Sequence, residues 1–380
     1  MSLIYLDFNR TTPVAPSVIE VMQPYFAEHF MLPVQSHVHA SAVGEAIESA
    51  REKVAILLGC DPFEIVFTGG GTEANNLAIL GLAESSVPSD DDDAVPHALV
   101  SSVEHEAVLE AVHHLGGEQW DVQCIPCDED GLIDVDEFAS HFRSSTRLAC
   151  LQLANPVLGT IQPIRDLADR CHNHGIQLHC DATAAVGKIP VDVASLRVDT
   201  LALSGHKMYG PKGSGAIYVR RGLELRPITY GESREMGLRA GSENVPAIVG
   251  LGAAAHLTGR CVHDAQETLD TLRSRLIDGL REVFGDEITV LAETVAGLPN
   301  TVAIEMPADA QRLQQAARQL VVATAQSQVP PDEMTRVLRA IGRNEKQIGR
   351  TMRFSAGWTT SREQVDRAVN LLAEATECRT

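Results

Sequence analysis

Short apolar runs alternate with amphipathic segments through the first two thirds of the chain. Residues 65–67 form an apolar run. Three glycines follow it, and then a helical pattern from Glu73 to Leu82. The same order is repeated by an apolar run over 97–103 and a helical pattern over 106–115, and further strand and helix patterns cover 148–153, 164–174, 176–180, 200–203 and 216–219. This alternation predicts an α/β fold with an open, mostly parallel sheet covered by helices. Ligands of such sheets bind beyond the carboxyl ends of the strands.

The pattern changes after about residue 255. Leucines and a valine then recur at the spacing of one long amphipathic helix, at Leu269, Leu272, Leu276, Leu280 and Val283. A strand region over 296–304 and a last helix that includes residues 365–372 follow. We therefore expect a large domain over 16–255 and a small domain over 256–380. Residues 1–15 are expected to form an N-terminal segment that packs with the small domain.

Composition and charge narrow the class of protein. Of 380 residues, 44% are hydrophobic and 22% are charged, which is typical of a globular protein. The formal net charge of −20 argues against nucleic acid and against an anionic membrane surface as partners. No apolar run reaches about 18 residues, the length that a membrane-spanning helix needs, and the start of the chain lacks the pattern of a secretory signal. We expect a cytoplasmic protein whose eight cysteines are reduced thiols.

Lys207 stands where a nucleophilic amine is useful. It ends the segment Ser204-Gly-His-Lys207, which follows an apolar strand and precedes a glycine-rich turn. Small neighbours can leave such a lysine partly desolvated, which lowers the pKa of an amine and makes it reactive towards an aldehyde. Taken alone, a surface lysine in a glycine-rich turn is the more common interpretation.

Three further segments place polar groups at strand ends. The turn before the helix at 73–82 offers the backbone N–H groups of Gly71 and Thr72 to an anion, although a plain strand–helix turn also uses glycines. Asp181 follows an apolar strand and suits either a cationic ring nitrogen or a helix N-cap. His105 follows another strand, where it could stack on a flat ring or simply be packed. Together, an anion cradle, an acid, a stacking ring and a lysine suit pyridoxal 5′-phosphate.

The chain resembles the cysteine desulfurases, a group within the class V aminotransferases and the fold type I pyridoxal-phosphate enzymes. The resemblance runs from about Tyr5 to Glu374. It rests on segments in matching order: 5–13, 67–76, 104–105, 179–183, 204–207, 237–242 and 353–357. It implies a mostly parallel seven-stranded sheet in the large domain, a smaller α+β domain and a homodimer.

The resemblance also implies roles for single residues. Lys207 would bond covalently to the cofactor and move protons, Asp181 would pair with the ring nitrogen, and His105 would stack on the ring as a second catalytic residue. The phosphate would be held by Gly71, Thr72, Ser204 and His206, with Ser242 reaching it from the other subunit. Arg353 and Asn155 would bind the substrate, since a guanidinium suits a carboxylate.

Several positions depart from the family pattern. The loop that carries the nucleophilic cysteine of desulfurases matches residues 321–331 here, where Ser327 is the nearest equivalent, and no cysteine occurs between Cys261 and Cys378. Two contacts to the ring oxygen of the cofactor are also replaced, by Pro156 and by Ala184. Arg10 adds a cation near the substrate entrance.

These features predict a pyridoxal-phosphate enzyme that acts on an amino acid. Because the loop thiol is missing, C–S lyase chemistry, transamination or another reaction at the α-carbon is favoured over persulfide-forming desulfuration. A genuine cysteine desulfurase and a non-catalytic cofactor-binding scaffold are the alternatives, and a nucleotide-binding α/β protein is a weaker one. The sequence names neither the amino acid nor a sulfur-accepting partner. We expect no metal site, because Cys124 and Cys127 have no second cysteine pair nearby.

Overall fold

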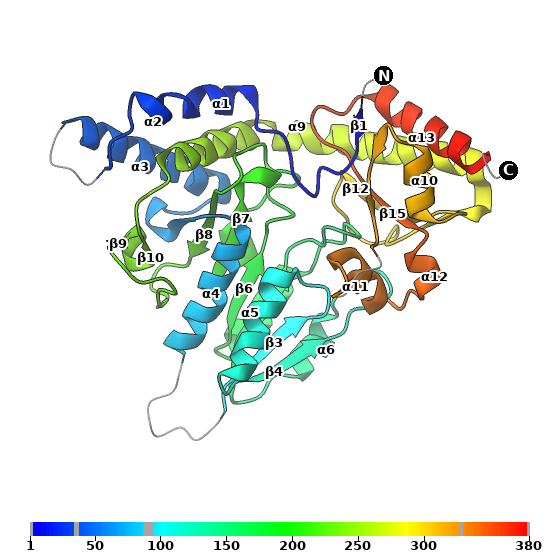
Figure 1. Ribbon diagram of the computed structural model, residues 1–380. Coiled ribbons are helices and arrows are strands. Elements are labelled where there is room, and N and C mark those ends of the chain that lie inside the picture. The colour runs from blue at the N-terminus through cyan, green and yellow to red at the C-terminus, as the bar shows by residue number, and fades with distance from the viewer. Residues whose placement is uncertain (1–2, 34–37, 87–94, 327–329, 378–380) are drawn as a thin grey trace.

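The large domain is built on a seven-stranded sheet. The computed structural model describes residues 3–33, 38–86, 95–326 and 330–377 (Figure 1). The strands lie in the order β2 (Ile65–Thr68), β8 (Gly215–Val219), β7 (Thr200–Ser204), β6 (Gln177–Asp181), β5 (Thr146–Gln152), β3 (His97–Ser101) and β4 (Asp121–Ile125). Six of these seven strands run in the same direction, and β8 runs opposite to them. The expected α/β class with a mostly parallel sheet is confirmed.

Helices cover both faces of this sheet. Every residue of β2, β3 and β7 is buried, as strands covered on both sides require. Because side chains alternate along a strand, Val66 packs in the core beneath one face and Phe67 in the core beneath the other. The first face is covered by α4 (Gly71–Ser85) and α5 (Glu106–Gly117). The second face is covered by α3 (Val38–Leu58), α7 (Ile164–Asn173) and the beginning of α9 (Val245–Phe284).

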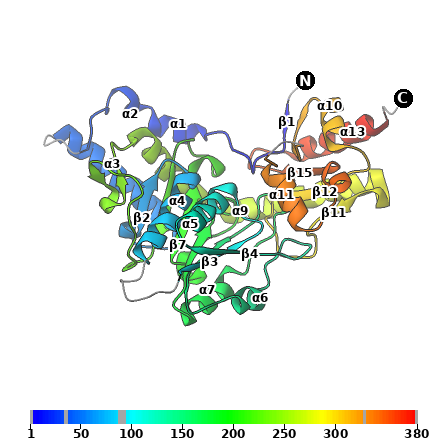
Figure 2. The same ribbon diagram turned by 60° about the horizontal axis from the view of Figure 1, so that its bottom comes forward.

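The small domain holds a second sheet and its own core. Four strands pair antiparallel in the order β11 (Thr289–Val290), β12 (Thr301–Glu305), β15 (Thr351–Ser355) and β14 (Ala323–Thr324). The N-terminal segment lies against this domain, because β1 (Ile4–Tyr5) pairs in parallel with β13 (Leu320–Val321) (Figure 2). The accompanying helices are α10 (Ala310–Ala316), α11 (Glu333–Ala340), α12 (Glu345–Ile348) and α13 (Arg362–Glu377).

One continuous helix joins the two domains. α9 is 40 residues long, and Val249 and Leu251 pack in the core of the large domain whereas Leu269 and Leu280 pack in the core of the small one. The boundary that we expected at residue 255 therefore falls inside a helix. By length and composition α9 could cross a membrane, but 61% of its most apolar window is buried inside the molecule, as in a core helix.

The remaining elements are short. They are α1 (Pro16–Met22), α2 (Pro24–Ala27), α6 (Val135–Ser140), α8 (Val193–Leu196), β9 (Ser233–Arg234), β10 (Arg239–Ala240) and the 3-10 turns η1 (Pro62–Glu64), η2 (Gly205–Lys207), η3 (Glu235–Gly237) and η4 (Gly285–Glu287).

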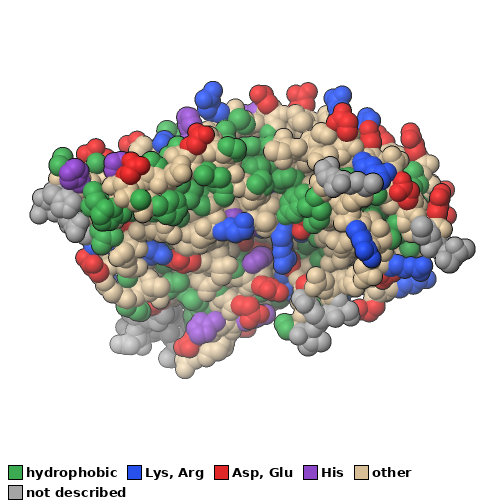
Figure 3. All heavy atoms as spheres, turned by 45° about the horizontal axis from the view of Figure 1, so that its top comes forward, with side chains coloured by type: hydrophobic (Ala, Val, Ile, Leu, Met, Phe, Trp, Pro, Cys, Tyr) green, Lys and Arg blue, Asp and Glu red, His purple; other side chains and the backbone are tan. Residues whose placement is uncertain are grey.

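Apolar side chains gather on the face formed by α1, α2 and the start of α3 (Figure 3). Phe26 is 66% exposed and Phe30 70% exposed, and Ile19, Val21, Leu32 and Val38 add to the same surface, which we call the N-terminal apolar face. An exposed apolar patch of this kind is typical of an interaction site.

Candidate active site

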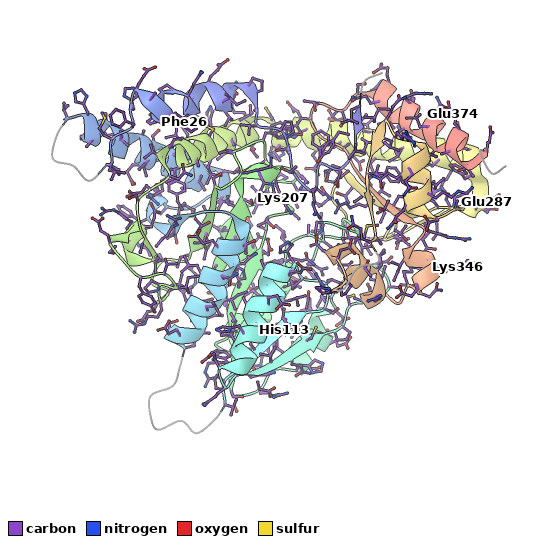
Figure 4. The ribbon with its side chains drawn as sticks, viewed as in Figure 1. Phe26, His113, Lys207, Glu287, Lys346 and Glu374 are labelled. Atoms are coloured by element: carbon purple, nitrogen blue, oxygen red, sulfur yellow. The ribbon has the colours of Figure 1, made fainter. Side chains whose placement is uncertain are left out.

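A cavity of about 350 Å³ lies at the carboxyl ends of the central strands, and both domains contribute to it. Lys207, in the turn η2 that follows β7, lies between the two domains (Figure 4). The cavity brings together nine of the residues singled out from the sequence: Arg10, Gly71, Thr72, His105, Asp181, Ser204, His206, Lys207 and Arg353.

The turn between β2 and α4 forms an anion cradle. Gly70 has a φ of 145°, a conformation that favours glycine. A side chain at Gly71 would place its Cβ 2.7 Å from Cγ2 of Thr183, so this position also requires glycine. The first N–H groups of α4 lack partners within the helix, and the Oγ of Ser204 beside them is buried with no partner among the described residues. These donors can hold a phosphate.

A network of hydrogen bonds fixes Asp181 at the end of β6. Its Oδ1 accepts from the backbone N–H of Thr183 and its Oδ2 from Nδ2 of Asn75, both at 2.8 Å. The Oδ1 of Asn75 lies 2.9 Å from Nε2 of His179, whose Nδ1 lies 2.9 Å from Oγ1 of Thr200. Because an amide oxygen only accepts, His179 carries its proton on Nε2. Burial lowers the pKa of His179 to about 4, so the imidazole is neutral and the charge of the carboxylate dominates this end of the cavity.

Two more histidines face the cavity. His105 is the N-cap of α5, and its Nδ1 accepts from the backbone N–H of Ala107 at 3.0 Å, which fixes the ring and places its proton on Nε2. His206 lies in η2 next to Lys207. Burial, with the nearby charges of Lys207 and Lys212, lowers the pKa of His206 to about 4. Its neutral ring can donate one hydrogen bond.

Arg353 presents a guanidinium from the central part of the small-domain sheet. The side chain is buried, forms an ion pair with Asp7 of the N-terminal segment, and donates from Nη1 to the carbonyl oxygen of Pro156 at 3.2 Å. The same carbonyl accepts from Nδ2 of Asn9 at 2.9 Å. The Nε of Arg353 has no partner among the described residues. The backbone carbonyl of Pro156 thus orients Arg353. The sequence did not suggest this contact, because proline has no polar side chain.

Other expected residues lie elsewhere. Asn155 is not among the residues that line the cavity, and its role in substrate binding stays a prediction. Its Nδ2 donates to the carbonyl of Val103, and its Oδ1 accepts from the backbone N–H groups of Val157 and Leu158, so its amide is used to build a buried turn.

Ser242 and Ala184 are also absent from the cavity lining, and Ser242 is exposed between β10 and α9. Ser327 lies outside the described residues. Within the described ranges, no group of three or more His, Cys, Asp or Glu side chains could hold a metal ion.

Comparison with known proteins identifies the family. The family model for class V aminotransferases matches residues 4–368. The chain belongs to the class V aminotransferase family. It is 36% identical to the cysteine desulfurase IscS of Methanosarcina thermophila, over 98% of this chain and 91% of that protein. It is 37% identical to cysteine desulfurase IscS 1 of Archaeoglobus fulgidus, over 97% and 95% of the two chains.

Solved structures agree with this assignment. A NifS-like protein superposes with a TM-score of 0.90 at 30% identity, over 99% of both chains. A structure of SspA in complex with cysteine has a TM-score of 0.80 at 33% identity, over 92% of this chain and 98% of that chain. The match extends over nearly the full length, so both domains belong to the fold type I arrangement.

The family uses pyridoxal phosphate, and this cavity fits it. The phosphate would be held by the N–H groups at Gly71 and Thr72 and by the orphaned hydroxyl of Ser204. Asp181 would face the ring nitrogen, and Lys207 would supply the amine for the aldehyde. When bound, the cofactor withdraws electrons from the α-carbon of an amino acid.

Several lining residues were not expected from the sequence: Asn9, Asn75, Glu106, Thr183, Asp332 and Glu333. Asn75 had a usable signal, because it lies four residues after Gly71 and therefore on the same face of α4. Asp332 and Glu333 had none, because only the tertiary fold brings the start of α11 to the strand ends of the large domain.

Proposed function

We propose that the protein is a pyridoxal-phosphate enzyme that cleaves the Cβ–S bond of L-cysteine. The observation that carries this proposal is the single cavity that combines an anion cradle, Asp181, Lys207 and the buried guanidinium of Arg353. The names of the relatives, cysteine desulfurases, and the cysteine complex of SspA support cysteine as the substrate.

Different residues of the cavity would bind the substrate, move its proton and hold the cofactor. Arg353 binds the α-carboxylate, with Asp7 and the carbonyl of Pro156 holding the guanidinium in place. Lys207 would hold the cofactor through its aldehyde and, as a free amine, would move the α-proton of the substrate as a general acid and base. Asp181 would hold the ring nitrogen, and His105 would pack on the ring.

Two products are compatible with Cβ–S cleavage. In desulfuration, cysteine and a thiol RSH give alanine and the persulfide RSSH. In elimination, cysteine and water give pyruvate, ammonia and hydrogen sulfide. The names of the relatives favour desulfuration. Since residues 262–377 contain no cysteine, an external thiol or a partner protein would then have to accept the sulfur.

Product analysis separates these outcomes. Purified protein is incubated with L-cysteine, with and without dithiothreitol, and alanine, pyruvate and sulfide are measured, with Lys207→Ala as the matched inactive control. Alanine that depends on the added thiol supports desulfuration, and pyruvate in equal amount to sulfide supports elimination. Binding of L-cysteine without any of the three products would show a non-catalytic homologue and contradict the proposal.

We also propose a cytoplasmic homodimer with shared active sites. A second subunit could cover the exposed N-terminal apolar face. Ser242 is exposed and lies outside the cavity of its own chain, where it could reach the cavity of a partner. Sedimentation of the cofactor-loaded protein tests the assembly: a monomer with full cofactor occupancy would contradict it.

A further inference from the structure

The outer edge of β2, the strand that leads into the anion cradle, is closed by an ion pair. β2 is the outermost strand of the large sheet and pairs with β8 on its inner side. On its outer side, Nη1 of Arg51 donates to the carbonyl oxygen of Ile65 at 2.7 Å, and Oε2 of Glu235 accepts from the backbone N–H of Phe67 at 2.8 Å. Arg51 also donates to both oxygens of Glu235, at 2.7 and 2.9 Å, and the two side chains are only 8% and 4% exposed. The pair thus makes the hydrogen bonds that a neighbouring strand would make.

Glu235 belongs to a hairpin over residues 233–240, which we call the β9–β10 hairpin. Its two strands pair antiparallel, and η3 forms the turn between them. Glu235 and Met236 have φ values of 47° and 55°, a backbone conformation that is uncommon for residues other than glycine. Such a conformation persists where the surrounding contacts hold it. The contacts of Glu235 with Arg51 and with the backbone of Phe67 therefore fix this hairpin against the edge of β2.

The same hairpin contacts the glycine turn of the anion cradle. Nε of Arg239 donates to Oε1 of Glu73 at 2.6 Å, and Oε2 of Glu73 accepts from the backbone N–H of Gly69 at 2.7 Å. Glu73 lies in the first turn of α4, and it lines a neighbouring cavity together with Gly71 and Ser204 of the cradle. This carboxylate therefore fixes the start of the glycine turn, and it also brings a negative charge to the turn that offers the phosphate donors. The ion pair with Arg239 compensates that charge.

We infer that Arg239 is a positioning residue for the phosphate group of the cofactor and that it acts through Glu73. Without the guanidinium, Glu73 is left as an unpaired anion in the turn that binds phosphate, and its hold on the N–H of Gly69 loses its support. Both effects weaken the binding of the phosphate. They leave the rest of the cofactor site in place, because Asp181 and Lys207 lie on β6 and η2. The inference rests on the fit of pyridoxal phosphate to the cavity and is independent of the cleavage of cysteine.

Pyridoxal phosphate and pyridoxal, which lacks the phosphate, separate the two parts of the site. The full-length protein, freed of cofactor, is titrated with each compound and followed by absorbance. Arg239→Ala should bind pyridoxal phosphate about tenfold or more weakly than wild type and should bind pyridoxal within about twofold of it. Arg239→Lys keeps a cation for Glu73 and should recover most of the lost affinity. The matched control is Arg234→Ala, because Arg234 is the cross-strand partner of Arg239 and forms its ion pairs with Glu232 and Glu243, on either side of the hairpin. This control should bind both compounds as wild type does.

A second substitution tests the route through Glu73. In the Glu73→Ala background, Arg239→Ala should change the affinity for pyridoxal phosphate by no more than about twofold, because the carboxylate on which Arg239 acts is gone. A full loss in that background overturns the inference, as does wild-type affinity for pyridoxal phosphate in Arg239→Ala alone.

An equal loss of affinity for both compounds also overturns the inference, because that result shows general damage to the fold. If pyridoxal binds too weakly to titrate, inorganic phosphate is used as a competitor of pyridoxal phosphate, and its inhibition constant should rise about tenfold in Arg239→Ala. If Arg239→Ala does not fold, Arg239→Gln takes its place with the same expected values. Failure of the proposed function is a separate result, since a protein that forms no products from cysteine still shows these binding ratios.

Discussion

Glu104 makes the stability of the protein depend on pH in a direction opposite to that of most carboxylates. It lies between β3 and α5 and is completely buried. Its Oε1 accepts from Oγ of Ser101 at 2.5 Å and from the backbone N–H of Gln152 at 2.9 Å, and its Oε2 has no partner among the described residues. Burial is the largest cause that raises the pKa of Glu104, from 4.5 to about 8. The carboxyl group is therefore neutral in the folded protein at neutral pH.

The sign and size of the change in stability with pH follow from the difference between the pKa of Glu104 in the folded and in the unfolded chain. Between the pKa of the unfolded chain and that of the folded protein, the folded state binds the extra proton, so the free energy of unfolding falls as pH rises. At about 1.4 kcal/mol for each unit of pH, the loss between pH 6 and pH 8 is roughly 2 kcal/mol after allowance for partial ionisation near pH 8. Glu104→Gln keeps the shape and the acceptor but carries no proton to lose.

Denaturant unfolding at a fixed protein concentration tests the argument. Midpoints are measured for wild type and Glu104→Gln from pH 6 to pH 8.5, with Glu106→Gln as an exposed neighbouring control. The difference between Glu104→Gln and wild type should move by roughly 2 kcal/mol in favour of the variant over this range. Parallel pH profiles for the two proteins would refute the reasoning, because they would show that Glu104 is ionised in the folded state.

Four further results are expected. Borohydride should fix pyridoxal phosphate to Lys207, and peptide mapping that finds the label on the buried Lys188 instead would contradict the site. Gly71→Ala should weaken cofactor binding about tenfold or more, because its Cβ would lie 2.7 Å from a methyl group of Thr183; full cofactor content after dialysis would count against the cradle. Arg353→Lys should weaken amino-acid binding in absorbance titrations by about tenfold, since an ammonium lacks the planar fork, and unchanged affinity would argue against a carboxylate clamp. Phe26→Asp should shift sedimentation towards a monomer, whereas an intact dimer would place the interface elsewhere.

The polar residues at the strand ends could be predicted from the sequence, because each is recognised from the residues next to it in the chain. The turn at Gly71, the acid at Asp181 and the lysine at 207 each lie at or within three residues of the end of a buried strand, and parallel strands bring their carboxyl ends to one edge of a sheet. Short apolar runs and a helical period of three to four residues defined the elements around them. The fold class and the cofactor followed from this arrangement.

Other parts of the site depend on contacts that no local pattern encodes. Arg353 meets Asp7 across 346 positions, and the carbonyl of Pro156 joins them although proline offered no polar side chain. Asn155 was expected from the motif to bind substrate, and the tertiary fold adds a structural role, because its amide hydrogen-bonds to Val103, Val157 and Leu158 in a buried turn. The long helix across the domain boundary was not predicted for a similar reason, because α9 stays helical while the core beneath it changes.

The pairing of β1 with β13 sets the order in which a growing chain can become functional. Ile4 leaves the ribosome early, but its partner Leu320 is added 316 residues later (320 − 4). At about 5–20 residues per second, the first strand waits roughly 15–60 seconds for its neighbour. Asp7 and Asn9 are carried on the same segment, so the carboxylate clamp cannot be assembled until Arg353 has also emerged. A nascent or truncated chain that lacks Arg353 therefore also lacks the proposed clamp for the substrate carboxylate.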